Sequence, residues 1–285
     1  MASTRTVTLI GADGTRHVLA CSTEPYQLGV NAQLWGTAPY SVTSRQLGAI
    51  PGERVERVRA LARDVLIPIQ VEGSTELEID QRLGALGSIL SPMAELRVLY
   101  RRPDGTTREL TGRAVSGMER IQATDRSGHL QRHVRVPLVV RAHYPYWRST
   151  AASINVVGPT TFNDGLLAGS NVVDVTNAGD VDTWPEITIT GLANGADLLN
   201  MTTGQVLRIS ERIESGQTCR IDTDPRSRSI VINDVWAWPV DALSEFWPLV
   251  PGPNRLLLRT WSDYPALTPA IGTFTIRWRS NFETC

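Results

Sequence analysis

The sequence predicts a mainly β protein of two domains. Residues 1–150 are expected to form an N-terminal β-sandwich-like domain with one α-helix, and residues 151–285 a C-terminal jelly-roll β-sandwich. Short runs of alternating apolar and polar residues fill both halves, turns rich in Gly and Pro separate them, and one stretch alone has a convincing helical period. A length of 285 residues is enough for two ordinary domains, and 41% hydrophobic with 20% charged residues is typical of globular proteins.

The first half opens with a predicted hairpin. Residues 4–10 and 16–21 alternate on either side of Asp13-Gly14, and Asp-Gly between alternating runs is a hairpin signal. From residue 26 to residue 50 glycines and a proline interrupt the pattern. This segment is therefore predicted to be extended or loop-rich.

Further strands are predicted after this segment. The first covers residues 64–72, and Pro68 within it favours an edge strand or a bulge because proline cannot donate to a ladder. A second hairpin joins residues 96–101 to residues 106–110 through Asp104-Gly105. Residues 113–119 and 133–142 complete the domain, and a linker is expected at 148–153.

One helix is predicted over residues 75–90. Thr75 followed by Glu78 is a capping-box arrangement, in which a hydroxyl satisfies an unpaired N–H and an acid favours the positive end of the helix dipole. Gly84 and Gly87 weaken such a helix, so we expect them to mark a close approach to another backbone. The apolar residues at helical spacing are Leu77, Ile79, Leu83, Leu86, Ile89 and Leu90.

The second half is predicted to be β throughout. Its last strand alternates Phe274, Ile276 and Trp278 with polar residues, so one face is expected to be buried and the other wet. Short strands at this spacing are typical of a sandwich. The predicted strands are 172–176, 186–190, 205–209, 218–222, 229–232, 254–260 and 273–279.

The charges divide unevenly between the halves. All 28 basic residues are arginine; residues 1–150 hold 19 of them against 14 acids, whereas residues 151–285 hold 9 against 15. Two independently solvated domains would explain this difference. Alternatively, the basic half meets something acidic, such as nucleic acid or a neighbouring protein.

Neither terminus nor interior suggests export through a leader or insertion into a membrane. The first ten residues lack the apolar core of a signal peptide, and no stretch approaches about 20 apolar residues. We therefore expect a protein made in the cytoplasm. Three widely separated cysteines, Cys21, Cys219 and Cys285, indicate thiols rather than a disulfide framework.

A series of short motifs follows in a fixed order along the second half. They are Asn177-x-Gly179-Asp180, Trp184-Pro185-x-Ile187-x-Ile189-x-Gly191, Asn200-x-Thr202-Thr203-Gly204, Ser215-Gly216 before Cys219–Thr223, and Phe246-Trp247-Pro248-Leu249-x-Pro251-Gly252-x-Asn254. In the first half, Ile67-Pro68-Ile69-x-Val71-x-Gly73 leads into a helix. Each motif alone is weak, but their order and spacing over residues 60–260 are specific. In this order they resemble a known family, the siphovirus-type distal tail proteins of bacteriophages.

The resemblance implies a structural protein of the virion tail tip, assembled in the host cytoplasm, without cofactor or metal. Such proteins form homo-hexameric rings from their N-terminal domains, with a galectin-like C-terminal sandwich outside. The ring joins the tail tube to the tail-tip, tape-measure and receptor-binding proteins, and genomic DNA passes through its lumen. Arginines of the first half are then expected to approach that lumen, and no membrane insertion is expected.

The motif residues also have a physical interpretation of their own. Gly179, Gly191, Gly204 and Gly252 suit turns with positive φ, and prolines fix φ where strands begin or end. Most tryptophans, including Trp184 and Trp247, are expected in the sandwich core. The alternative is that Trp236, Trp238 and Trp247 form a platform on which sugar rings stack, which makes the domain an adhesion module for host cell-wall carbohydrate.

Enzyme hypotheses are the least favoured. His129, His133 and His143 could be drawn as a metal set, but no carboxylate follows at a useful spacing. The pairs Asp222/Asp224 and Glu211/Glu214 imitate a glycosidase pair, yet turns commonly carry such acids. The sequence contains no phosphate-binding glycine loop and no nucleophile elbow.

Overall fold

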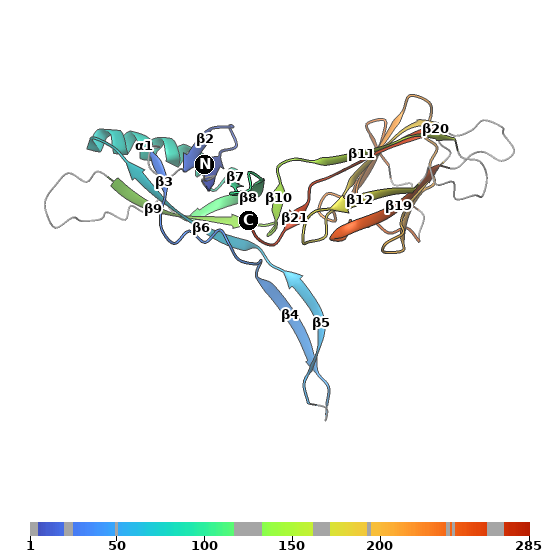
Figure 1. Cartoon of the computed structure of the whole chain (residues 1–285), viewed down its shortest axis with the longest axis horizontal. Helices are drawn as coiled ribbons and strands as arrows, with labels where there is room; N and C mark the ends of the chain where they lie inside the picture. Colours follow the sequence, from blue (N-terminus) through green and yellow to red (C-terminus); the bar gives the residue numbers. More distant parts are fainter. Residues whose placement is uncertain are drawn as a thin grey trace. The chain divides into compact units, whose positions relative to one another are not determined.

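The computed structural model describes residues 5–19, 25–48, 51–116, 133–161, 172–192, 195–237, 240, 243–260 and 271–285. The chain divides into two compact units (Figure 1). Unit 1 contains residues 1–150 and 282–285, and unit 2 contains residues 151–281. The predicted second domain extended to residue 285, whereas the last four residues group with unit 1. The chain therefore passes between the units twice.

Unit 1 is built around one antiparallel sheet. Its main path runs β2-β1-β7-β8-β9-β6-β3, and β10 and β21 pair at its side. The two ends of the path, β2 and β3, lie beside each other, so the sheet is nearly closed. Its strands are β1 (Thr6–Ile10), β2 (Arg16–Leu19), β3 (Tyr26–Leu28), β6 (Arg63–Glu72), β7 (Leu96–Arg101), β8 (Thr107–Ser116), β9 (His133–Ala142), β10 (Trp147–Ser149) and β21 (Asn281–Phe282).

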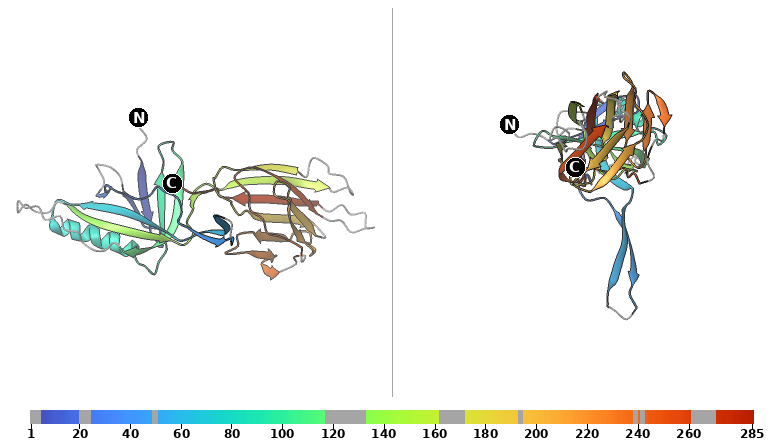
Figure 2. Two further views of the ribbon diagram at one scale, coloured as in Figure 1. Left: turned by 90° about the horizontal axis from the view of Figure 1, so that it is seen from below. Right: turned by 90° about the vertical axis from the view of Figure 1, so that its right-hand side faces the viewer.

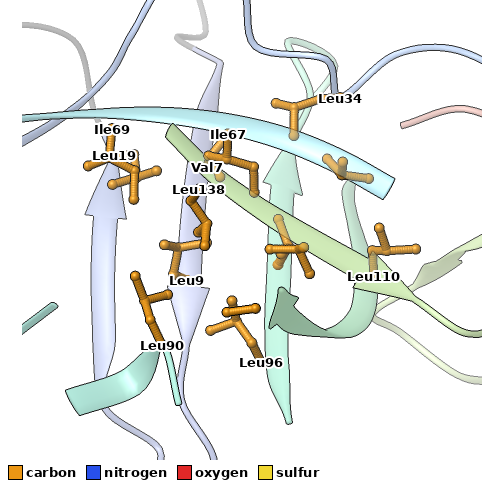
Figure 3. Packing of buried hydrophobic residues seen from close by; sticks show 14 of the residues in the cluster. Val7, Leu9, Leu19, Leu34, Ile67, Ile69, Leu90, Leu96, Leu110 and Leu138 are labelled. Carbon is orange, nitrogen blue, oxygen red and sulfur yellow. The ribbon is translucent and has the colours of Figure 1, made fainter. Parts of the chain in front are cut away.

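The core of unit 1 lies inside this curved sheet (Figure 3). Leu9 of β1, Ile67 of β6 and Leu138 of β9 are fully buried there because alternate residues of each strand point inward. Trp147 is also fully buried. Leu90, directly after the helix, points into the same cluster.

The predicted helix is confirmed as α1 (Glu76–Ile89). The Thr75 hydroxyl accepts the Glu78 N–H at 3.2 Å, and the Glu78 carboxylate accepts the Ser74 N–H at 2.8 Å, so the cap forms as predicted. Leu77 differs from the prediction because it is exposed. Gly84 has open space where a side chain would be, so its predicted close approach is wrong.

Pro68 is not on an edge strand, which corrects the prediction. β6 pairs with β9 on one side and β3 on the other, and Pro68 lies directly opposite Pro137. The Pro68 carbonyl accepts the Gly29 N–H at 2.7 Å. The backbone N and C=O of one strand residue point to the same side, so the N–H that Pro68 lacks would face Gly29 just beyond β3 and not β9. The proline therefore removes no hydrogen bond between β6 and β9.

Residues 26–50, predicted to be extended or loop-rich, form strands over part of that segment. β4 (Tyr40–Gln46) and β5 (Glu53–Ala60) form an antiparallel two-stranded sheet that pairs with no other described strand. This hairpin, which we call the arm, extends away from the main sheet of unit 1 in Figure 1 and in the right-hand view of Figure 2. Every residue of β4 and β5 except Ala60 is exposed.

Unit 2 is a two-sheet β-sandwich, as predicted. One sheet has the order β11-β20-β13-β16-β17-β18 and the other β12-β19-β14-β15. Apolar residues of both sheets meet in one core. The strands are β11 (Ser153–Thr161), β12 (Val172–Asn177), β13 (Glu186–Leu192), β14 (Ala196–Asn200), β15 (Gln205–Ile209), β16 (Thr218–Asp222), β17 (Ser229–Ile232), β18 (Val235–Ala237), β19 (Gly252–Thr260) and β20 (Ile271–Trp278).

Several local details differ from the sequence prediction. The predicted linker at 148–153 is partly strand, because β10 pairs with β8 and β11 begins at Ser153. Strands β11, β14 and β18 were not predicted. Trp184 is only partly buried, whereas Trp247 is fully buried as expected. In the part of the chain that is described, no helix is long and apolar enough to cross a membrane.

Two cysteines are buried thiols in the cores of different units. Burial raises the pKa of Cys219 in unit 2 to about 12 and that of Cys285 in unit 1 to about 11. Both are therefore protonated and poorly reactive at neutral pH. Cys21 lies outside the described residues.

His17 is a buried titratable group in the sheet of unit 1. Its ring contacts Tyr26 edge to face at 4.8 Å, and its Nε2 atom has no hydrogen-bond partner. Desolvation lowers the pKa of His17, although the Ala85 carbonyl and the charge of Asp13 oppose the shift. The neutral ring is therefore the form that fits the fold.

We predict that unit 1 loses stability as the pH falls below about 6.5, the ordinary pKa of histidine. The folded state binds a proton on His17 less readily than the unfolded chain, so the contribution is full above that pH and decreases toward the folded pKa. The expected slope is at most about 1.4 kcal/mol per pH unit. Denaturant unfolding between pH 7.5 and 5.5 measures it.

His17→Gln should remove this slope, whereas His143→Gln should leave it unchanged because His143 is exposed. Equal slopes in the parent and the His17 variant would contradict the prediction.

Candidate functional site

The motif residues of unit 2 include three buried asparagines. Asn177, at the end of β12, donates through Nδ2 to the carbonyls of Val181 at 2.9 Å and Leu249 at 3.0 Å. Its Oδ1 accepts the Gly179 N–H at 3.0 Å. One side chain thus joins the bend after β12 to a segment 72 residues later in the chain.

Asn254, near the start of β19, bonds the residues that come just before it in the chain. Its Oδ1 accepts the Val250 N–H at 2.9 Å, and its Nδ2 donates to the carbonyls of Val250 at 2.8 Å and Gly252 at 3.0 Å. Gly252 has φ of 87°, a left-handed conformation that L side chains rarely adopt. Asn254 and Gly252 together fix the turn that leads into β19.

Residues 246–249, which precede Asn254 in the chain, are buried in the core of unit 2. Asn200 donates to the Pro248 carbonyl at 3.0 Å, and the Trp247 indole donates to the Leu198 carbonyl at 2.8 Å. Leu249 exchanges two backbone hydrogen bonds with Thr183, at 2.7 and 3.0 Å. A buried polar group must be paired. Here Asn177 and Asn200 pair with carbonyls outside regular ladders, and the indole pairs with a carbonyl of β14.

Gly179 corrects the prediction of a positive φ, because it is not among the left-handed glycines. A Cβ atom at this position would collide with the carbonyl oxygen of Asn281. That carbonyl accepts the Asp180 N–H at 3.2 Å. Gly179 is thus required for a close approach of two backbones.

The remaining motif residues lie at turns and strand ends. Pro185 is buried, and its carbonyl accepts the Thr223 hydroxyl at 2.6 Å. Gly191, near the end of β13, has φ of 111°. Thr203 and Gly204 form the turn between β14 and β15, and Pro251 is exposed before β19. The motif polar groups are therefore bonded within unit 2, and we interpret them as structural.

Trp236 is the exposed tryptophan of the predicted sugar platform. It lies on β18, the edge strand of the larger sheet, with 66% of its surface exposed, and its neighbour Val235 is exposed as well. Trp238 lies outside the described residues. Trp247, the third member of that hypothesis, is fully buried and so is not available to a ligand.

Of the acids in the enzyme hypotheses, Asp222 and Asp224 lie in one turn, where the Asp222 carboxylate accepts the Asp224 N–H at 3.0 Å. Asp222 accepts the Ser227 hydroxyl at 2.6 Å, and Asp224 bonds Arg226, so both stabilise the turn after β16. His129 lies outside the described residues, as does the side chain of His133. Among the described side chains no cluster of histidine, cysteine or acid could hold a metal ion.

The arm of unit 1 has a well-anchored base. Arg63, at the start of β6, is buried and donates to the carbonyls of Gly36 at 2.9 Å and Glu283 at 2.6 Å. The Glu283 carboxylate accepts the Ala38 N–H at 3.0 Å and the Tyr40 hydroxyl. The C-terminal residues therefore hold the point where the arm leaves the sheet.

The pairing register gives the arm two different faces. Val42 lies opposite Val58, and Thr43 lies opposite Arg57. Because successive side chains point to opposite faces, the valines lie on one face of the hairpin and the arginines on the other. A bulge at Glu56 keeps this arrangement, because the extra residue restores the alternation beyond it. The valine face carries Tyr40, Val42, Val55 and Val58 together with Ala60 and the polar residues Ser44, Gln46 and Glu53. The arginine face carries Ser41, Thr43, Arg45, Arg54, Arg57 and Arg59.

A sequence signal for the arm was present but interrupted. Arg54-Val55 and Arg57-Val58-Arg59 alternate perfectly once Glu56 is left out. A bulge adds one residue to a strand, and therefore disguises a period of two. Allowing one insertion would have revealed both the strand and its two faces.

Comparisons with known proteins agree with the fold. Residues 178–280 match the family described as the siphovirus-type tail component, C-terminal domain. Over 97% of this chain and 99% of that chain, the structure is similar to Dit of phage SPP1, with a TM-score of 0.67 and 14% identity. A phage p2 baseplate chain gives a TM-score of 0.49 at 11% identity over 96% of this chain and 97% of that chain. A search of curated protein sequences gives no match.

The fold and the matched domain define a structural component of a bacteriophage tail. More specifically, residues 178–280 match the C-terminal domain of siphovirus-type tail components, which agrees with the resemblance seen in the motifs of the second half. Its location is the virion tail.

We predict that Asn254→Ala lowers the free energy of unfolding of unit 2 by about 2–3 kcal/mol. The substitution leaves the Val250 N–H and two carbonyls without partners in a site that is 1% exposed. Chemical denaturation followed by circular dichroism measures the loss.

Asn155→Ala is the control, because Asn155 is half-buried on β11 and no side-chain hydrogen bond is recorded for it in the described structure. It should change the free energy by less than about 0.5 kcal/mol. Similar small effects of both substitutions would refute the structural role of Asn254.

Proposed function

We propose that the chain is the hub of the tail, forming a homo-hexameric ring. This ring joins the tail tube to the tail-tip, tape-measure and receptor-binding proteins, and genomic DNA passes through it during ejection. The single observation that carries the self-assembly is the valine face of the arm. Val42, Val55 and Val58 are each more than half exposed on a hairpin that pairs with no other described strand.

The arm is poorly suited to stand alone in water. An isolated two-stranded hairpin is marginally stable, and three or more strands or a packed face are needed to hold it. A cluster of exposed valines gains about 1.5–3 kcal/mol per side chain when a partner buries it. The anchored base, with Arg63 and Glu283 bonded to residues 36–40, presents this face in a defined direction.

A ring requires a contact between unlike surfaces of neighbouring copies that closes after a fixed number of subunits. An arm that extends from the sheet of one copy and covers a different surface of the next satisfies this requirement. The similar SPP1 protein is described as a paradigm of the hub adsorption apparatus in phages that infect Gram-positive bacteria, which supports the same role here. No catalytic residues are part of this proposal.

We predict that Val42→Thr/Val58→Thr weakens ring assembly. Each substitution places a hydroxyl where a methyl group would be buried, which costs about 1–3 kcal/mol. At about 2 kcal/mol or more per interface, association weakens by at least about 30-fold. Sedimentation velocity and electron microscopy of the purified chain measure the ring population against concentration.

Arg54→Gln/Arg57→Gln, on the opposite face of the arm, is the matched control and should leave assembly within about threefold of the parent. A parent chain that remains monomeric with tail-tube and tail-tip proteins present would overturn the proposal.

A second candidate function, carbohydrate binding by unit 2, is favoured by the exposure of Trp236 on an edge strand. An exposed indole offers a flat apolar face on which a sugar ring can stack. This function is compatible with the hub, since a tail protein can also contact the host surface.

If Trp236 binds sugar, Trp236→Ala should weaken binding to host cell-wall polysaccharide about 10-fold or more without changing the circular dichroism spectrum. Val235→Ala, at the adjacent exposed position, should have little effect. A glycan array without a single bound sugar would exclude this candidate.

A further inference from the structure

The arginine face of the arm holds four charges that the described structure does not neutralise. Arg45, Arg54, Arg57 and Arg59 are exposed, and neither an ion pair nor a hydrogen bond to an acid is recorded for any of them among the described residues. Elsewhere in unit 1, Arg82 pairs with Glu78 and Arg141 with Asp64. These four arginines therefore gather unneutralised positive charge on one face of a single hairpin.

The arrangement is unfavourable for the free chain. Arg45 lies directly opposite Arg54, and like charges in opposed positions destabilise an antiparallel pair. Arg57 and Arg59 are two residues apart on the same strand, about 7 Å along it, and add to the repulsion. An anionic partner on this face would remove the penalty.

The composition of the face indicates what kind of anion. Protein interfaces contain apolar or aromatic anchors among their charges, but the valines of the arm all lie on the other face. What remains beside the arginines is Ser41 and Thr43, whose hydroxyls are neutral donors. Arginine with serine and threonine on an extended surface is the set that contacts the phosphates of nucleic acids.

We propose that the arginine face binds the phosphate backbone of double-stranded DNA without regard to sequence. The inference depends on the proposed function for its setting, the passage of DNA through the ring. In that ring the two faces of the arm have different partners. The valine face contacts a neighbouring copy, and the arginine face contacts the DNA.

Salt dependence gives the size of the expected effect. If each of the four arginines neutralises one phosphate, the affinity for a duplex falls about 100-fold between 50 and 200 mM salt. Arg54→Gln/Arg57→Gln removes two contacts, so the same change in salt should weaken binding by only about 10-fold. The affinity of this variant at 50 mM salt should be lower than that of the parent.

Fluorescence anisotropy with a labelled 30-base-pair duplex tests the proposal on the full chain. The arginine substitutions are introduced both in the parent and in Val42→Thr/Val58→Thr, so that a loss of DNA binding is not a consequence of lost assembly. Arg45→Gln/Arg59→Gln is a second pair that should give the same loss. Polyglutamate of matched charge is the competing probe for an acidic protein surface.

Three results would overturn the inference. They are no binding of the duplex at 50 mM salt, equal binding by the parent and both arginine variants, or displacement of the labelled duplex by polyglutamate but not by unlabelled DNA. A loss of DNA binding with intact assembly supports it. If the valine variant assembles normally while the arginine variants lose DNA, the inference stands and the proposed contact between copies fails.

Discussion

The organisation of unit 2 depends on buried side-chain amides that replace a missing strand ladder. Residues 246–251 cross the core outside any strand, with one bridge to Thr183. Residues 246–249 are buried, and the amides of Asn177 and Asn200 bond the Leu249 and Pro248 carbonyls, while Asn254 bonds Val250 beside them. This arrangement inserts Trp247 between the two sheets and connects the end of β12 with the start of β19.

The arm of unit 1 differs from the core of unit 2, because its side chains are exposed and not buried. Its backbone groups are paired within the hairpin, but its side chains have almost no core of their own, because two strands cannot enclose one. Because Arg63 and Glu283 bond the base of the arm, the arm presents its exposed side chains in a defined direction. The Glu56 bulge keeps valines on one side and arginines on the other, so one short hairpin presents two chemically different surfaces.

The sequence predicted well wherever a local rule decided the structure. The cap of α1 follows from Thr75 and Glu78, and the hairpin at Asp104-Gly105 follows from a turn with φ of 84° at the glycine. It failed where the partner decided the outcome. Pro68 suits a central strand because its backbone groups face Gly29, just beyond β3, and not β9. Gly179 is needed because the Asn281 carbonyl approaches it.

The sequence by itself determined the mainly β class, the helix, most strands of the sandwich and the family, because alternation, caps, turns and motif order are local properties of the chain. Tertiary structure alone decided the asparagine network, the burial of Trp247 against the exposure of Trp236, the return of residues 282–285 to unit 1 and the two faces of the arm. Each of these depends on which residues meet across long separations. That pairing is set by packing and strand register, which no local pattern contains.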